Sequence, residues 1–119
     1  MRVLVCGGRE FDNLDLFLTS MDDISTRLNF NNKQPITIIE GGARGADFMA
    51  RCYAKYCGWE LKEVKADWKK YGNAAGPLRN QQMLDEEEPD VVIAFPGGNG
   101  TRDMIDKARK AGIKVIHCA

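Results

Sequence analysis

The sequence predicts an α/β fold in which a five-stranded parallel sheet is covered by helices on both faces. Five short apolar runs alternate with longer stretches of helical periodicity, which is typical of doubly wound sheets. The run Val91–Phe95 is apolar throughout, as expected of a fully buried parallel strand. A chain of 119 residues can build one hydrophobic core but not two, so we expect a single domain over residues 1–119.

The predicted strands are short, and four helices are expected between them. The strands cover Val3–Cys6, Ile36–Ile39, Leu61–Val64, Val91–Phe95 and Lys114–His117. The first helix is predicted over Leu14–Leu28, before the break at Phe30–Pro35. Its apolar stripe consists of Leu14, Phe17, Leu18, Met21, Ile24 and Leu28.

The other three helices are predicted from residues that typically mark where a helix begins or ends. The second runs from Ala46 to Tyr56 and stops at Gly58, a good position for a glycine in the left-handed conformation. The third begins near Pro77 and precedes the acidic run Asp85–Pro89, which we expect to be a solvated surface loop. The fourth covers Thr101–Ala111 and stops at Gly112, with Asn99 or Thr101 as its cap.

Composition excludes several classes of protein. The 17 basic and 17 acidic side chains cancel, so no net field draws the chain to nucleic acid or to a membrane. The apolar amino-terminal run is too short for a signal peptide, and no span approaches the ~20 apolar residues of a membrane helix. A cytoplasmic protein is therefore expected.

Metal, cofactor and redox chemistry are not expected. The single histidine, His117, and the absence of a CxxC pair leave no zinc-type ligand set. We expect all four cysteines to be buried, reduced thiols. They are Cys6, Cys52, Cys57 and Cys118.

The glycine-rich segment Pro96–Thr101 joins a buried strand to a helix, which is how many proteins build a phosphate site. Gly97, Gly98 and Gly100 lack the Cβ that would block close approach, and the first N–H groups of the following helix have no partner within it. Those donors and the helix dipole favour an anion. The alternative is a flexible loop that binds nothing.

Two more glycine-rich turns follow predicted strands, at Gly7-Gly8 and at Gly41-Gly42. With the strand order 3-2-1-4-5, the first turn faces the Pro96–Thr101 turn across the carboxyl edge, where open α/β sheets bind ligands. Four arginines accompany these segments, and guanidinium groups match phosphate geometry. They are Arg9, Arg44, Arg79 and Arg102, of which Arg102 is the weakest candidate.

The connection Lys65–Gly76 is longer than most loops that join a strand to a helix, and such loops are usually functional or disordered. Its Trp68 and Tyr71 either stack on a base or pin the loop to the core. Asp67 and Asn73 either bond ribose hydroxyls or cap local turns. No Walker A motif and no GxGxxG is present, which disfavours an ordinary NTPase or an NAD-dependent dehydrogenase.

Five motifs occur in the order found in the YspA-like branch of the SLOG superfamily, a group of Rossmann-like domains, and the chain resembles that branch over nearly its whole length. The motifs are Gly7–Phe11, Gly41–Asp47, Ala66–Trp68, Ala75–Asn80 and Ala94–Thr101. The resemblance implies a nucleotide or nucleotide-derived ligand, held by a sensor, carrier or sequestering protein. It also implies a homodimer or larger oligomer, for which Phe48, Met49 or Met83 would supply an exposed apolar patch.

Residues from the three turns, the long connection and the third helix are expected to contact this ligand. They are Gly7, Gly8, Arg9, Gly41, Gly42, Arg44, Asp47, Asp67, Trp68, Arg79, Asn80, Pro96, Gly97, Gly98, Asn99, Gly100 and Thr101.

Two alternative functions follow from relatives within the superfamily. LOG-type phosphoribohydrolases cleave the N-glycosidic bond of nucleoside monophosphates with a PGGxGTxxE motif, but this chain has Met104 at the glutamate position. Asp103, Asp47 and Glu40 are the candidate substitutes. The second alternative, single-stranded nucleic-acid binding as in DprA proteins, is disfavoured by the zero net charge.

Overall fold

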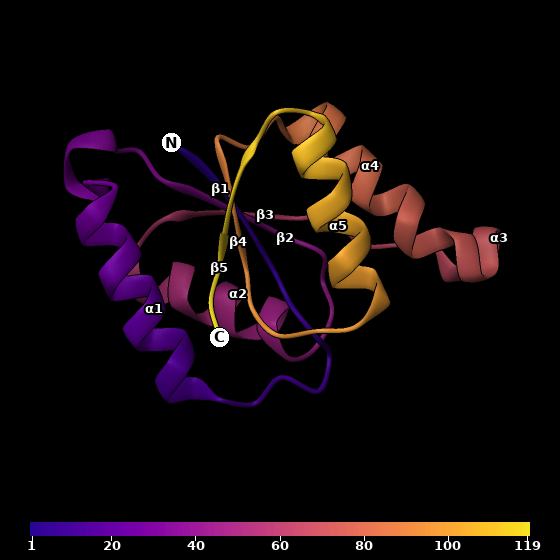
Figure 1. Ribbon diagram of the computed structural model, residues 1–119, viewed down its shortest axis with the longest axis horizontal. Helices are drawn as coiled ribbons and strands as arrows, with labels where there is room; N and C mark the ends of the chain where they lie inside the picture. The colour runs from indigo at the N-terminus through magenta and orange to yellow at the C-terminus, as the bar shows by residue number, and fades with distance from the viewer.

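A computed structural model describes residues 1–119 as a five-stranded sheet flanked by helices (Figure 1). The strand order is β3-β2-β1-β4-β5 and every pairing is parallel, so the predicted topology is confirmed. The central strand β1 sets the register of the sheet, because its Leu4 pairs with Ile39 of β2 on one side and with Val92 of β4 on the other. The strands are β1 (Arg2–Cys6), β2 (Thr37–Glu40), β3 (Glu60–Glu63), β4 (Val91–Ala94) and β5 (Lys114–His117).

Two helices cover each face of the sheet. On one side, α1 (Leu14–Arg27) and α2 (Ala46–Cys57) pack on Val3 and Val5 of β1. On the other side, α4 (Ala75–Glu87) and α5 (Asn99–Lys110) pack on the alternate β1 residues, such as Leu4. Because successive strand residues point to opposite faces, one buried strand serves both cores. The central strands are consequently apolar at nearly every position.

The first helix buries a narrower stripe than its sequence predicts. Phe17, Met21 and Ile24 are buried, whereas Leu14 and Leu18 are exposed. Asn13 caps this helix through its Oδ1, which accepts a hydrogen bond from Leu16 N at 3.0 Å. The expected break after the helix contains a short 3₁₀ helix, η1 (Phe30–Lys33), that buries Phe30.

The long connection is ordered into two short helices, α3 (Trp68–Tyr71) and η2 (Gly72–Ala74). Helix α4 then begins at Ala75, so Pro77 occupies its third position, not its first as predicted. The helix continues into the acidic run, and the prediction of a surface loop from Asp85 is wrong. An ion pair stabilises this end, with Arg2 Nη2 at 2.8 Å from Glu87 Oε1.

Three smaller expectations are also corrected. The cap of α5 is Gly98, and neither Asn99 nor Thr101 caps the helix with its side chain. All four cysteines are free, but Cys52 is exposed and Cys57 is half-buried. Met83 is buried in the α4 core, so it cannot supply an exposed patch, whereas Phe48 is 53% exposed.

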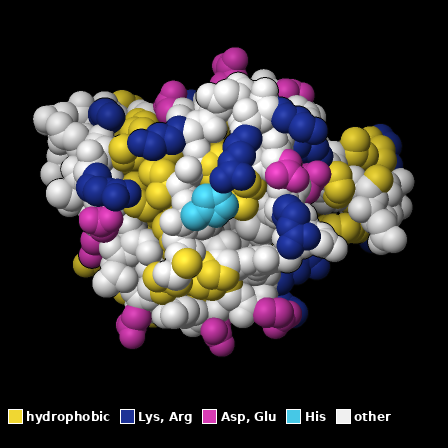
Figure 2. Space-filling model, viewed as in Figure 1, with side chains coloured by type: hydrophobic (Ala, Val, Ile, Leu, Met, Phe, Trp, Pro, Cys, Tyr) yellow, Lys and Arg dark blue, Asp and Glu magenta, His cyan; other side chains and the backbone are white.

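Acidic and basic side chains share the face shown in Figure 2, in keeping with their equal numbers in the chain. The single histidine lies on this face, with His117 Nε2 at 2.8 Å from Arg109 Nη2. None of the helices is both long enough and apolar enough to span a membrane.

Candidate functional site

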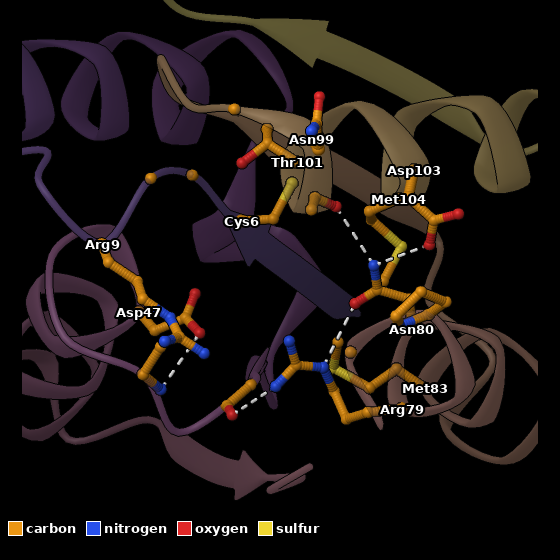
Figure 3. A pocket seen from close by; sticks show the side chains of 18 of the residues that line it. Cys6, Arg9, Asp47, Arg79, Asn80, Met83, Asn99, Thr101, Asp103 and Met104 are labelled. Carbon is orange, nitrogen blue, oxygen red and sulfur yellow. Dashed lines mark hydrogen bonds between the residues drawn. The ribbon is translucent and has the colours of Figure 1, made fainter. Parts of the chain in front are cut away.

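A cleft of about 570 Å³ opens at the carboxyl edge of the sheet, where the segments after β1, β2 and β4 meet the start of α4 (Figure 3). It brings together most residues that the sequence singles out. The predicted ligand contacts that line it are Gly7, Gly8, Arg9, Gly41, Asp47, Trp68, Arg79, Asn80, Gly98, Asn99, Gly100 and Thr101. Cys6, Glu10, Asn73, Pro77, Met83, Asp103 and Met104 also line it.

The turns after β1 and β4 are in close backbone contact. Gly8 N donates a hydrogen bond to Pro96 O at 2.9 Å, so the two turns are held side by side. A Cβ on Gly97 would overlap Thr101 Oγ1 and lie 2.7 Å from Gly8 N. A Cβ on Gly7 would lie 2.5 Å from Ala46 Cβ. Glycine is required at these positions because the segments pack too closely for a side chain.

The neighbouring glycines have a different role. A Cβ on Gly98 or on Gly100 would meet no atom within 4 Å, so the space in front of the α5 amino terminus is open. The first N–H groups of an α-helix have no partner inside the helix, and no side chain caps α5. These donors lie at the cleft together with the positive end of the helix dipole. They can receive an anion.

Arg79 enters the cleft from α4 and is half-buried. Its Nη1 donates to Gly41 O at 2.6 Å and its Nε donates to Asn80 Oδ1 at 3.2 Å (Figure 3). Burial lowers the pKa of this guanidinium from its ordinary value, while the charge of Asp47 acts in the opposite direction. Neither of these hydrogen bonds is to a carboxylate, so the guanidinium keeps charge available for a ligand.

Asn80 joins α4 to the α5 segment. Its Nδ2 donates to Gly100 O at 3.1 Å and to Asp103 Oδ2 at 3.0 Å, so both amide hydrogens are used within the protein. Asp103 Oδ2 is also 2.8 Å from Lys107 Nζ. Asn80 and Asp103 therefore line the cleft as parts of a bonded network.

Asp47 lies in the first turn of α2 and is buried. Its Oδ2 accepts a hydrogen bond from Ala43 N at 3.2 Å. Burial raises the pKa of its carboxyl to about 6, and the charge of Glu40 acts in the same direction, whereas the Ala43 hydrogen bond and the charge of Arg79 oppose it. Burial also raises the pKa of the nearby Cys6 thiol to about 12, which keeps that residue protonated. Asp47 is thus a carboxyl in the cleft whose pKa burial raises well above its ordinary value.

Glu40 does not line the cleft. Its side chain is fully buried beneath the β2 turn, where its Oε1 accepts from Gly42 N at 2.6 Å and from Arg51 Nη2 at 3.2 Å. Arg51 Nη2 also reaches Ala43 O at 3.2 Å, and Arg51 Nε lies 3.3 Å from Glu63 Oε2. Glu40 is therefore placed to support the turn and not to contact a ligand in the cleft. Arg51 is not among the residues predicted for the site, although its spacing of four residues from Asp47 puts both on one face of α2.

Trp68 lies at the edge of the cleft and is 47% exposed. The guanidinium of Arg9 lies 5.0 Å from the centre of its ring, within the range of a cation–π contact. Asp67 does not line the cleft, because its Oδ1 caps α3 by accepting from Lys70 N at 3.1 Å. Of the two alternatives for Asp67, the structure supports the local cap.

The remaining predicted residues lie around the cleft. Gly42 and Arg44 line an adjoining cavity, and Pro96 and Gly97 line a shallow hollow beyond Gly8. Arg102 is exposed and lines none of these spaces.

Met104, at the glutamate position of the LOG motif, is buried in the same core cluster as Leu4, Cys6 and Met83 and also lines the cleft. Its thioether is uncharged and cannot transfer a proton in a reaction.

Comparisons with known proteins identify the family of this chain. The Gene 61 protein of Mycobacterium phage D29 is 34% identical over 127 residues, which cover 98% of this chain and 94% of the phage protein. The X-ray structure of TM1055, a Northeast Structural Genomics Consortium target, has the same fold with a TM-score of 0.66 at 20% identity, over 96% of this chain and 71% of that chain. The family model described as "YspA, cpYpsA-related SLOG family" matches residues 1–71, and the chain belongs to this family.

Proposed function

We propose that the protein binds a phosphate-bearing nucleotide or nucleotide-derived ligand in the cleft, as a sensor, carrier or sequestering protein. The observation that carries this proposal is the open amino terminus of α5, where Gly98 and Gly100 leave backbone donors uncovered. Arg79 and Arg9 line the same cleft and add fixed positive charge. Backbone donors, a helix dipole and guanidinium groups together favour a phosphate over a neutral ligand.

The rest of the cleft suits the other parts of a nucleotide. Trp68 places a half-exposed ring at the edge of the cleft, with Arg9 over it, and bases stack on aromatic rings whatever their identity. The volume of about 570 Å³ lies within the range of small-molecule sites. In this proposal the phosphate lies at α5 and the base lies toward α3.

N-glycosidic hydrolysis is the second candidate function, and the environment of Asp47 favours it. Cleavage of an N-glycosidic bond needs a carboxylate near the ribose and usually an acid for the departing base. Burial raises the pKa of Asp47 to about 6, so this carboxyl can hold or release a proton near neutral pH. Asp103 also lines the cleft, but Asn80 and Lys107 already bind its carboxylate. Binding without rapid turnover remains our first proposal because Met104 replaces the glutamate.

We further propose that the protein acts in the cytoplasm as a homodimer or larger oligomer. Phe48, which projects from α2 beside the turn that carries Arg44, supplies an apolar contact for a second copy. Its ring lies 5.6 Å from the guanidinium carbon of Arg51.

Calorimetric titration with AMP, GMP, CMP and UMP tests the proposed function. Gly98→Val places a side chain in open space in front of the α5 donors, so we expect at least about a tenfold loss of affinity, since a hydrogen bond to a charged group contributes about 1.5–3 kcal/mol. Thermal unfolding of this variant should match that of the wild type. Ala111→Val, at the other end of α5, serves as the control.

Failure of all four nucleotides to bind, or unchanged affinity in Gly98→Val, would show that the α5 terminus is not the phosphate site. Chromatography of the same mixtures separates the two candidates. Free base that accumulates with the wild type but not with Asp47→Asn or Asp103→Asn would favour the hydrolase.

A further inference from the structure

A second cavity adjoins the cleft on the side of β3 and has a different charge. Its volume is about 460 Å³, and its charged lining consists of Arg9, Arg44, Lys65 and Arg79 without any acidic side chain. The cleft itself is lined by Glu10, Asp47 and Asp103 in addition to two arginines. We call the second space the basic cavity. Its charged lining favours anions, whereas the lining of the cleft carries both signs of charge.

The two spaces meet along one wall. Arg9, Trp68 and Arg79 line both of them. The α5 donors belong only to the cleft, whereas Arg44 and Lys65 belong only to the basic cavity. A single phosphate in one space therefore does not use both sets of donors.

The cations of the basic cavity are available to a ligand. Arg9 is stacked on Trp68, and the hydrogen bonds of Arg79 go to Gly41 O and Asn80 Oδ1, not to a carboxylate. Arg44 pairs with Glu10 and Lys65 pairs with Glu63, but the side chains of Arg44 and Lys65 are 72% and 75% exposed. Exposed ion pairs contribute little to stability, so these two side chains can turn to a bound anion at small cost.

We propose that the natural ligand carries two separate anionic groups, one at the α5 amino terminus and one in the basic cavity, on either side of the Arg9–Trp68–Arg79 wall. This inference rests on the proposed function, because the first group is the phosphate assigned to the cleft. It narrows the ligand class to nucleotides with a second phosphate or phosphodiester beyond the first. A nucleoside monophosphate then uses only half of the site.

Calorimetry with AMP, adenosine 3′,5′-bisphosphate and the 5′-phosphorylated dinucleotide pApA tests this inference, because the last two probes carry their second anionic group at different spacings. We expect at least one of them to bind about tenfold more tightly than AMP, since the second group gains hydrogen bonds to charged donors. In the double variant Arg44→Gln/Lys65→Gln the gain should disappear while AMP affinity stays unchanged. The double variant Lys69→Gln/Lys110→Gln removes the same two charges at exposed residues that line neither space, so it should keep the gain and controls for net charge.

The inference is overturned if neither probe binds more tightly than AMP, or if the gain survives in the double variant. It stands separately from the proposed cleft site. If Gly98→Val leaves AMP affinity unchanged while the gain still depends on Arg44 and Lys65, the basic cavity is supported and the α5 phosphate site is not. If none of the three probes binds and GMP, CMP and UMP also fail to bind, both proposals are wrong.

Discussion

The two sides of the cleft are held in place by different physical means. On the β1–β4 side the turns pack backbone against backbone, and glycine at positions 7 and 97 allows that approach. On the β2–α4 side the turn is held by charged side chains, because Glu40 and Arg51 bind its N–H and C=O groups from below. Close packing depends on the absence of side chains, whereas the ionic support depends on the presence of both partners.

This difference separates residues that hold the turns in place from residues that border the open space of the cleft. Gly97 and Glu40 each hold a turn, while Gly98 and Asp47 lie beside them and line the cleft. Motif residues that look equivalent in the sequence therefore have different roles. Substitutions on each side test that division.

The largest effect is expected from Arg51→Met on the β2–α4 side. Glu40 is fully buried and would keep only Gly42 N as a donor, so the free energy of unfolding should fall by about 3–5 kcal/mol. Urea denaturation measures this change. Arg27→Met is the matched control, because its ion pair with Asp23 is exposed and should contribute less than about 1 kcal/mol. Equal losses in the two variants would contradict ionic support of the turn.

Asp47→Asn sharpens the comparison through pH. Because folding raises the pKa of Asp47 from its ordinary value of 3.8 to about 6, the folded state prefers the protonated carboxyl. Its ionisation therefore lowers wild-type stability as the pH rises from about 4 through 6. Relative to Asp47→Asn, the wild type should lose about 2–3 kcal/mol between pH 4 and pH 7. Urea denaturation at a series of pH values measures the difference, and parallel curves would show that burial does not perturb this carboxyl.

The smallest pair of effects is expected on the β1–β4 side, in the turn between β4 and α5. Gly97→Ala places a methyl group against Thr101 Oγ1 and Gly8 N, so overpacking should lower stability by about 1–3 kcal/mol. Gly98→Ala meets no neighbour and should change stability by less than about 0.5 kcal/mol. Chemical denaturation of both variants checks the contrast. Similar losses at the two positions would mean that close packing is not what requires glycine at 97.

Much of the fold could be predicted because the relevant signals are local. The run Val91–Phe95 contains strand β4, and Gly58 caps α2 in the left-handed conformation as expected. The errors occur where a distant contact competes with a local signal. Acidic residues disfavour a helix carboxyl terminus, yet α4 continues to Glu87, which pairs with Arg2, 85 residues earlier in the chain.

The location of the candidate site could be predicted from the sequence, but the roles of its individual residues could not. Glycine turns and arginines after parallel strands converge on one edge because all the strands point the same way. Lys65 and Arg51 carry no local motif, so the sequence did not indicate that one lines a cavity and the other supports a turn.

The sequence by itself determined the order of elements, the parallel sheet and the edge where the cleft lies, since these depend on periodicity and on turn residues along the chain. Only the tertiary structure decided which carboxylate faces the cleft and which glycine leaves space in front of a helix. Glu40 ends β2 and Asp47 lies in the first turn of the helix that follows, but Arg51 binds the first of these carboxylates and the second borders the cleft. Burial and charge at a side chain depend on neighbours that are distant in sequence, and folding alone brings those neighbours together.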